Sequence, residues 1–242
     1  MDNPLTLNAL FRFQDDAAAH NLSQSEHLRE LVAYVEDSVA LLADCLFSMH
    51  FPTHKQHALR VLGADAVTGI VSSVRAGLWG NLPEAAVLLR AALETISIVA
   101  AAVEAREYES LATELASARL RRHDYARSKA KLGDLGARID RLRGRLSEVG
   151  AHSTGTRLKF SSYEIEGQLF DRVGAALDPT AAELALAMAP DVCLHFLDTC
   201  VKAYDQEGTP FPDRIRLSEL RARFEECKGR AGRGEPTESD NQ

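Results

Sequence analysis

The chain has 242 residues, of which 45% are hydrophobic and 26% are charged, a composition typical of a globular protein that can bury its own core. Its net charge of −7 excludes a globally basic surface for nucleic acid or an anionic membrane. The four cysteines form no CxxC pair, which argues against a zinc ribbon or a thioredoxin site. We interpret them as small buried residues in a reducing compartment: Cys45, Cys193, Cys200 and Cys227.

The N-terminal part predicts a short arm followed by two long helices. Residues 1–22 contain enough apolar side chains for about one helical turn of this arm to pack against the rest of the protein. Ser23 and Glu26 form a capping box that begins the first helix, which is expected to end near Met49. A second helix, with apolar residues at helical spacing, is predicted over 54–78.

The third predicted helix, Glu84–Glu104, is apolar on nearly every side, which is typical of a helix in the middle of a bundle. Within it, Ala85–Val103 is long enough to cross a membrane, but Arg90 and Glu94 lie near its middle. Inserting these two charges costs roughly 5–7 kcal/mol, against about 2–5 kcal/mol gained from the apolar residues. With no signal peptide at the N-terminus, we predict a cytoplasmic protein that makes no contact with membranes.

The C-terminal part predicts more helices and one non-helical stretch. Alternating apolar and polar residues favour a short β-hairpin near 157–172. Asp178 opens the last core helix, with Thr180 and Glu183 as a capping box, and Pro190 is expected to kink it. The helices predicted here span 108–129, 134–149, 178–204 and 213–228.

These elements predict an all-α fold, an up-and-down helical bundle with one central apolar helix. The expected organisation is an arm over 1–22, a bundle over 23–205, a C-terminal helix over 206–230 and a disordered tail over 231–242.

Arg90 and Glu94 are the first residues that could carry a function. Four residues apart, they share one helix face, and in an apolar helix each charge needs a partner. They form either an internal ion pair that fixes the packing of the helix or the lining of a polar pocket.

Arg145 and His152 are the second such pair, at the end of the arginine-rich helix predicted over 134–149. Arginine can hold a phosphate with two hydrogen bonds, and histidine is the usual general acid or base near neutral pH. The alternative is a solvated arginine and a histidine bonded to a backbone carbonyl. Arg141 and Ser147, on the same helix, are candidate binding residues beside the pair.

The stretch from Arg119 to Arg145 is locally basic and is either a solvated helical face or a phosphate-binding surface. The histidines at 50, 54 and 57 are divided by Pro52 between a helix end and a helix start, and no cysteine lies near them. We therefore expect neither a metal site nor another cofactor.

Two motifs carry a family resemblance. Gly80–Glu94 is similar to the LLRxxxE helix of an uncharacterised bacterial all-helical family, and Leu146–His152 is similar to its LSxxxH-type motif. That family remotely resembles the HEPN superfamily of helical bundles, many of them dimeric, metal-independent ribonucleases with an R-x(4–6)-H motif. The spacing of Arg145 and His152 fits this motif, whereas Leu146 replaces the polar residue usual after the arginine, and Ser153 replaces a common proline.

The resemblance implies a HEPN-like protein that binds RNA or a nucleotide and cleaves RNA without a metal. In this interpretation Arg145 holds the phosphate, His152 transfers the proton, and Arg90 with Glu94 shapes the pocket floor. The alternative is a non-catalytic helical interaction module; a homodimer is expected in either case.

Overall fold

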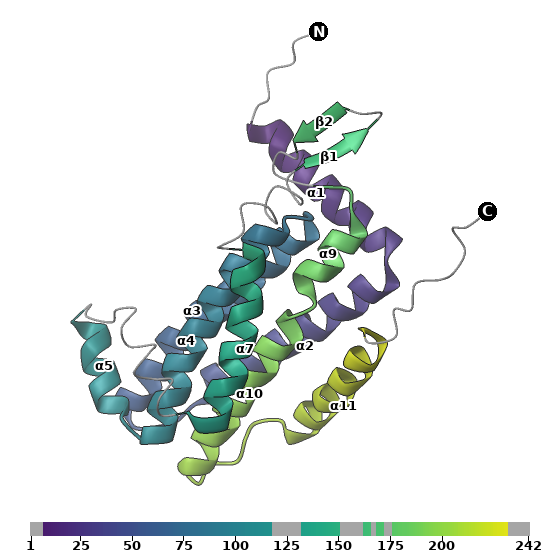
Figure 1. Ribbon diagram of the computed structural model, residues 1–242. Coiled ribbons are helices and arrows are strands. Elements are labelled where there is room, and N and C mark those ends of the chain that lie inside the picture. Colours follow the sequence, from purple (N-terminus) through teal and green to yellow (C-terminus); the bar gives the residue numbers. More distant parts are fainter. Residues whose placement is uncertain (1–6, 118–131, 151–161, 166–167, 172–175, 232–242) are drawn as a thin grey trace.

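The computed structural model describes residues 7–117, 132–150, 162–165, 168–171 and 176–231 (Figure 1). The described residues form a helical bundle, which confirms the all-helical fold predicted from the sequence. Its helices are α1 (Leu7–Gln24), α2 (Glu26–Ser48), α3 (Thr53–Leu78), α4 (Leu82–Ala105), α5 (Tyr108–Ala116), α7 (Gly133–Gly150), α9 (Pro179–Leu186), α10 (Ala189–Gln206) and α11 (Arg214–Ala231).

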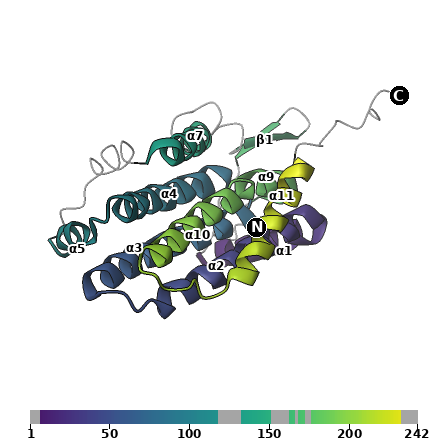
Figure 2. The same cartoon turned by 90° about the horizontal axis from the view of Figure 1, so that it is seen from below.

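Helix α4 is the central element, as its apolar sequence predicted. It packs against α3, α7, α9 and α10, and Leu89, Leu93 and Ile96 on it are completely buried. The side chain of Asn81 caps its first turn by accepting a hydrogen bond from Glu84 N at 3.4 Å. Figure 2 shows α7 as the outer layer over α4, on the side away from α2.

The N-terminal residues form a full helix rather than the short arm predicted over 1–22. Helix α1 packs against α2, α3 and α9. The Asn21 side-chain amide donates hydrogen bonds to Leu78 O and Ala176 O, both at 2.9 Å, and so joins α1 to the end of α3 and the residues before α9. Ser25 is the N-cap of α2 and accepts from Leu28 N at 2.9 Å.

The predicted capping box of Ser23 and Glu26 is therefore wrong, because the N-cap lies two residues later, at Ser25. Ser23 still belongs to α1, and its hydroxyl donates to His20 O at 2.7 Å. The sequence offers two serines near this boundary. Ser25 also donates a hydrogen bond to the Glu183 carboxylate, a tertiary contact that local sequence does not indicate.

The predicted helix over 178–204 is divided into α9 and α10. Asp178 caps α9 by accepting from Ala181 N at 3.0 Å. Because a proline ring clashes with the preceding turn of a helix, the chain turns at Ala187 and Met188, and Pro190 occupies the first turn of α10. The expected kink is thus a short interruption, at which Ala187 and Met188 keep right-handed helical backbone angles.

Helix α11 packs against α2 and α10 with Leu217, Leu220 and Phe224 buried. Its arginines meet aspartates of both neighbours: Arg216 with Asp37 (3.8 Å) and Asp44 (3.6 Å), Arg223 with Asp37 (2.5 Å), Arg221 with Asp198 (2.6 Å) and Arg214 with Asp205 (2.8 Å). The C-terminal helix combines apolar packing with a row of ion pairs. The tail predicted over 231–242 lies almost entirely outside the described residues.

Outside the helices, β1 (Ser162–Ile165) and β2 (Gln168–Asp171) pair antiparallel, with Tyr163 opposite Phe170. Figure 1 shows this pair beyond the end of α9, near the start of α1. The predicted helix over 108–129 is described only as α5, because residues 118–131 lie outside the described part.

Three cysteines are buried free thiols, as the sequence analysis expected: Cys45, Cys193 and Cys200. Burial, followed by the nearby carboxylates of Asp44 and Asp213, raises the pKa of Cys45 to about 12. The thiol therefore stays protonated, and chemically inert, over the physiological pH range.

The prediction of a cytoplasmic protein is corrected by the helices themselves. Three segments of the described chain are long and apolar enough to cross a membrane: Thr53–Leu78, Leu82–Ala105 and Pro179–Gln206. From the sequence, only Ala85–Val103 is expected to be long enough, and the insertion costs of Arg90 and Glu94 are those of isolated charges. In the structure these two side chains form an ion pair, so their separate insertion costs overstate the penalty.

Candidate functional site

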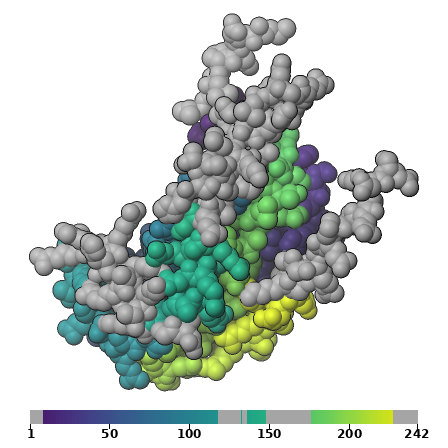
Figure 3. Space-filling model, in the orientation of Figure 1, coloured from purple at the N-terminus to yellow at the C-terminus, as the bar shows by residue number. Residues whose placement is uncertain are grey.

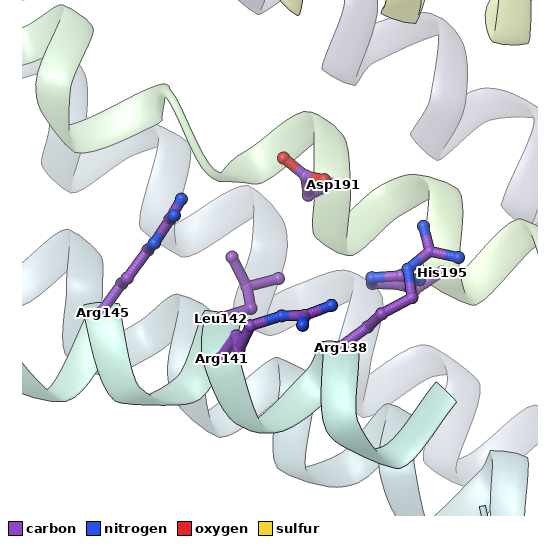
Figure 4. Close-up of a pocket in the computed structure, with 6 residues that line it drawn as sticks. All are labelled: Arg138, Arg141, Leu142, Arg145, Asp191 and His195. Atoms are coloured by element: carbon purple, nitrogen blue, oxygen red, sulfur yellow. The ribbon is translucent and has the colours of Figure 1, made fainter. Parts of the chain in front are cut away.

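An arginine-lined pocket of about 210 Å³ lies between α7 and α10. Both helices pack on α4, which sets the spacing between the two walls. Arg138, Arg141, Leu142 and Arg145 contribute from α7, and Asp191 and His195 contribute from α10. We call these six residues the α7–α10 pocket; Figure 4 shows them in close-up, and Figure 3 shows the surface of α7 beside that of α10.

The sequence of α7 places its arginines at the edge of the helix. Ile139, Leu142 and Leu146 are buried and hold α7 on the bundle. Positions 138, 141 and 145 are spaced by three and four residues, so they share one side of the helix next to this apolar face. The three arginines are exposed, and Figure 4 shows Arg138 and Arg145 extending toward α10.

The α10 wall is formed by two residues one turn apart. Asp191 is half-buried, and His195 is only 4% exposed, with its Nδ1 atom shielded from solvent. Figure 4 shows the Arg138 side chain reaching toward the His195 ring, with Asp191 farther along α10. Among the described lining residues, three guanidinium groups and one carboxylate sum to a charge of +2 when the imidazole is neutral. The pocket is therefore a small positive site with one acidic side chain.

Two of the predicted site residues meet in this pocket, namely Arg141 and Arg145. Ser147 does not line it; its hydroxyl donates to Arg143 O at 2.8 Å, one turn back along α7. His152 lies outside the described residues, so its position relative to Arg145 stays a prediction.

The remaining two predicted site residues, Arg90 and Glu94, do not line the α7–α10 pocket. Arg90 Nε donates to Glu94 Oε1 at 3.1 Å, and the side chains are 26% and 28% exposed. The pair lies at the edge of the buried face of α4, not deep in the core as the apolar sequence around it suggested. Of the two alternatives, the geometry therefore matches an ion pair, though a partly solvated one.

The sequence predicts no site role for four of the lining residues: Arg138, Leu142, Asp191 and His195. Of these, Arg138 belongs to the basic stretch over 119–145. A signal was present, because Asp191 and His195, four residues apart, share one face of α10. That this face lies opposite α7 follows only from the tertiary structure.

Among the described residues, no group of three or more histidine, cysteine, aspartate or glutamate side chains is arranged to hold a metal ion. The histidines at 50, 54 and 57 fall in this described part. The described residues that line the pocket offer guanidinium, carboxylate and imidazole groups.

Comparison with known proteins gives no relative from which a role could be transferred: no protein-family model, no curated protein and no solved structure matches the chain.

Proposed function

We propose that the protein is a HEPN-like RNA- or nucleotide-binding protein that holds a phosphate group of its ligand in the α7–α10 pocket. The supporting observation is that Arg138, Arg141 and Arg145 line one small cavity. Guanidinium groups are planar, always charged, and donate paired hydrogen bonds that match phosphate oxygens. A localised positive pocket also reconciles phosphate binding with the negative net charge of the whole chain.

In this proposal Arg145 contacts the phosphate and His152 handles the proton in RNA cleavage. The 2′-oxygen attacks phosphorus as His152 takes its proton, and the bond to the 5′-oxygen breaks as that oxygen takes a proton from water, which leaves a 2′,3′-cyclic phosphate and a 5′-hydroxyl. The arginines offset the negative charge that develops on the phosphoryl oxygens. The support for His152 is the R-x(4–6)-H spacing and the resemblance that goes with it.

The binding part is tested with single arginine variants and a labelled RNA oligonucleotide. Arg141→Ala and Arg145→Ala each remove a charge from the pocket and should weaken binding about tenfold or more. Arg143→Ala is the matched control, since Arg143 lies on the same helix but does not line the pocket. Equal losses in all three variants would show a general charge effect instead of a phosphate site.

The catalytic part is tested separately by comparing RNA cleavage in EDTA by the wild-type protein and His152→Ala. Cleavage by the wild type that is lost in the variant supports a metal-independent ribonuclease. Equal cleavage, or none by either protein, removes the catalytic proposal and leaves the binding proposal standing.

A second candidate function is a non-catalytic, homodimeric interaction module, and one observation favours it. Leu146, where active HEPN nucleases usually carry a polar residue, is completely buried in the core. It therefore supports packing of α7 and is not available to a substrate. An absence of both RNA binding and cleavage, combined with a dimer in light scattering, would favour this alternative.

A further inference from the structure

We propose that α3 and α4 form a helical hairpin, Thr53–Ala105, that can leave the bundle and span a lipid bilayer. Both helices are among the three described segments that are long and apolar enough to cross a membrane. The third segment, Pro179–Gln206, is interrupted between α9 and α10, so α3 and α4 are the continuous helices of the set. Spanning a bilayer is a function beyond phosphate binding, because the α7–α10 pocket requires α7 and α10 to pack on α4, as they do in the bundle.

The lengths and charges of the two helices fit a bilayer. Helix α3 has 26 residues and α4 has 24, against the roughly 20 that cross the hydrocarbon core. Between Arg60 and Arg75, the only charged residue of α3 is Asp65. Between its first and last turns, α4 carries only the charges of Arg90 and Glu94. The other charges lie toward the helix ends, where long side chains can reach the lipid head groups.

The charged side chains in the middle of the hairpin find their partners within the hairpin. Thr95 Oγ1 donates to Asp65 Oδ2 at 3.1 Å, which joins the central carboxylate of α3 to α4. Arg90 Nε donates to Glu94 Oε1 at 3.1 Å within α4. Ionisable groups of spanning helices are paired in this way, because an isolated charge in lipid is costly. The hairpin could therefore enter lipid with these contacts intact.

The two helices also pack on each other as helices do in lipid. Their contact is the most extensive between any two described elements, and Figures 1 and 2 both show them side by side. A Cβ atom added at Gly69 would lie 3.0 Å from Ala92 Cβ, so the helices approach closely where small residues meet. Ser73 Oγ donates to Ala85 O at 2.9 Å across the same contact. Close packing of small residues and hydrogen bonds between helices are the interactions that hold helices together in a bilayer.

The turn between the helices is closed by bonds to α3. Gly80 N donates to Gly77 O at 2.8 Å, and Asn81 N donates to Ala76 O at 3.0 Å. Gly80 has a φ of +73°, which favours glycine at this position. These bonds satisfy the end of α3 without help from the other helices, as a hairpin moving into lipid requires.

Trp79 and Arg75 mark the turn as an end suited to a membrane surface. The Arg75 guanidinium carbon lies 5.0 Å from the centroid of the Trp79 ring. Tryptophan is enriched where lipid meets water, and arginine extends from helix ends toward the head groups. The turn is therefore expected at one face of the bilayer, with the opposite ends of α3 and α4 at the other.

The surface that the hairpin presents to solvent is also compatible with lipid. Apart from Asp65, its exposed residues away from the helix ends are small, apolar or hydroxyl-bearing: Val61, Ala64, Thr68, Val71, Val87 and Ala91. The opposite faces of both helices supply much of the core of the bundle. Because both sides are largely apolar, lipid can replace the helices that cover the hairpin in the bundle.

Trp79 is the only tryptophan of the chain, so it reports on the turn in the unmodified protein. The full chain is diluted from urea into buffer or into phosphatidylcholine vesicles, with and without lipids brominated near the head group. We expect protein that resists carbonate extraction, Trp79 fluorescence quenched by the brominated lipid, and protection of 53–105 from external proteinase K. Mass spectrometry identifies the protected fragment.

The other outcomes overturn the membrane-spanning hairpin. Protein that carbonate removes, or that proteinase K cuts within 53–105, is adsorbed on the surface only. A chain that stays in solution with every vesicle preparation does not insert, and protection of 179–206 alone places the spanning segment elsewhere. RNA binding measured without lipid tests the α7–α10 pocket separately, so failure of one proposal leaves the other standing.

One added charge distinguishes lipid insertion from folding of the bundle. Thr68 is exposed near the middle of α3, so Thr68→Asp should leave thermal unfolding without lipid nearly unchanged but reduce the protected fraction about tenfold or more. Ala91→Asp, at an exposed central position of α4, is a second variant with the same expectation. Ser218→Asp, exposed on α11 outside the three segments, is the matched control and should insert as the wild type does. Wild-type insertion of both hairpin variants would overturn the proposal.

Discussion

Arg90 Nε lies 3.1 Å from Glu94 Oε1, one turn along α4, and both side chains are about one-quarter exposed. A partly solvated pair at this spacing contributes little to stability. We predict that replacing both residues by glutamine lowers the unfolding free energy by less than about 1 kcal/mol in urea denaturation. RNA affinity should not change, because neither residue lines the α7–α10 pocket. A loss above about 3 kcal/mol would indicate a fully buried pair.

Tyr204 offers a sharper stability test in the core. Its hydroxyl donates to Cys45 O at 2.7 Å, and the residue is 1% exposed. Tyr204→Phe keeps the ring but leaves this buried carbonyl without its donor, so the unfolding free energy should fall by about 1–3 kcal/mol. The comparison variant is Tyr108→Phe, whose hydroxyl bonds Gln206 Oε1 at a longer 3.3 Å. Equal losses in the two variants would contradict this ranking.

The ion pairs of α11 predict a local effect of salt. Asp37 accepts from Arg223 and also lies near Arg216, but its side chain is 46% exposed. Asp37→Asn, or about 0.5 M salt, should weaken the docking of α11 by less than about 1 kcal/mol.

Hydrogen exchange can measure this loss in α11 separately from the rest of the fold. We expect exchange of the α11 amides to rise by up to about fivefold while that of α4 is unchanged. Glu36→Gln, at an exposed neighbouring position of α2, is the control. A uniform increase over all helices would mean that α11 is not an independent unit.

The buried thiol of Cys45 predicts a pH dependence. Its pKa is raised from 9.0 to about 12 in the folded chain, so between these values the unfolded chain has lost a proton that the folded chain keeps. The contribution of Cys45 to the unfolding free energy is therefore constant below about pH 9 and falls as the pH rises toward 12.

Replacing the thiol isolates this contribution. The alkaline loss of stability should be smaller in Cys45→Ala than in the wild type when each is referred to its own value at pH 8. An identical pH dependence would show that Cys45 has the same pKa in both states. Thiol labelling at pH 8 should likewise modify Cys45 only on the timescale of unfolding.

The central helix could be predicted because its information is local. An unbroken apolar stretch after Asn81 predicted Glu84–Glu104, and the structure has Leu82–Ala105. The break between α9 and α10 was underestimated because Pro190 indicates a distortion without giving its extent. The N-cap of α2 is Ser25, whose hydroxyl also donates a hydrogen bond to Glu183, a residue far along the chain. No rule based on neighbouring residues can therefore distinguish Ser25 from Ser23.

The candidate site could likewise be predicted only in part. Arg141 and Arg145 could be placed together because they belong to one helix with a fixed period. Asp191 and His195 lie opposite these arginines because α7 and α10 both pack on α4. The period of a helix does not specify how two helices pack on a third. The prediction of no membrane contact was wrong for a related reason: the insertion costs of Arg90 and Glu94 were summed singly, whereas the cost of each charge depends on its neighbour.

The amide of Asn21 has a consequence for any shortened version of this protein. It donates hydrogen bonds to both Leu78 O and Ala176 O, and so links α1 to the residues that precede α9. Removing the N-terminal two dozen residues as a dispensable extension would release that anchor. The wall that carries Asp191 and His195 would then shift relative to its opposite side, so ligand binding would weaken although no lining residue had been touched.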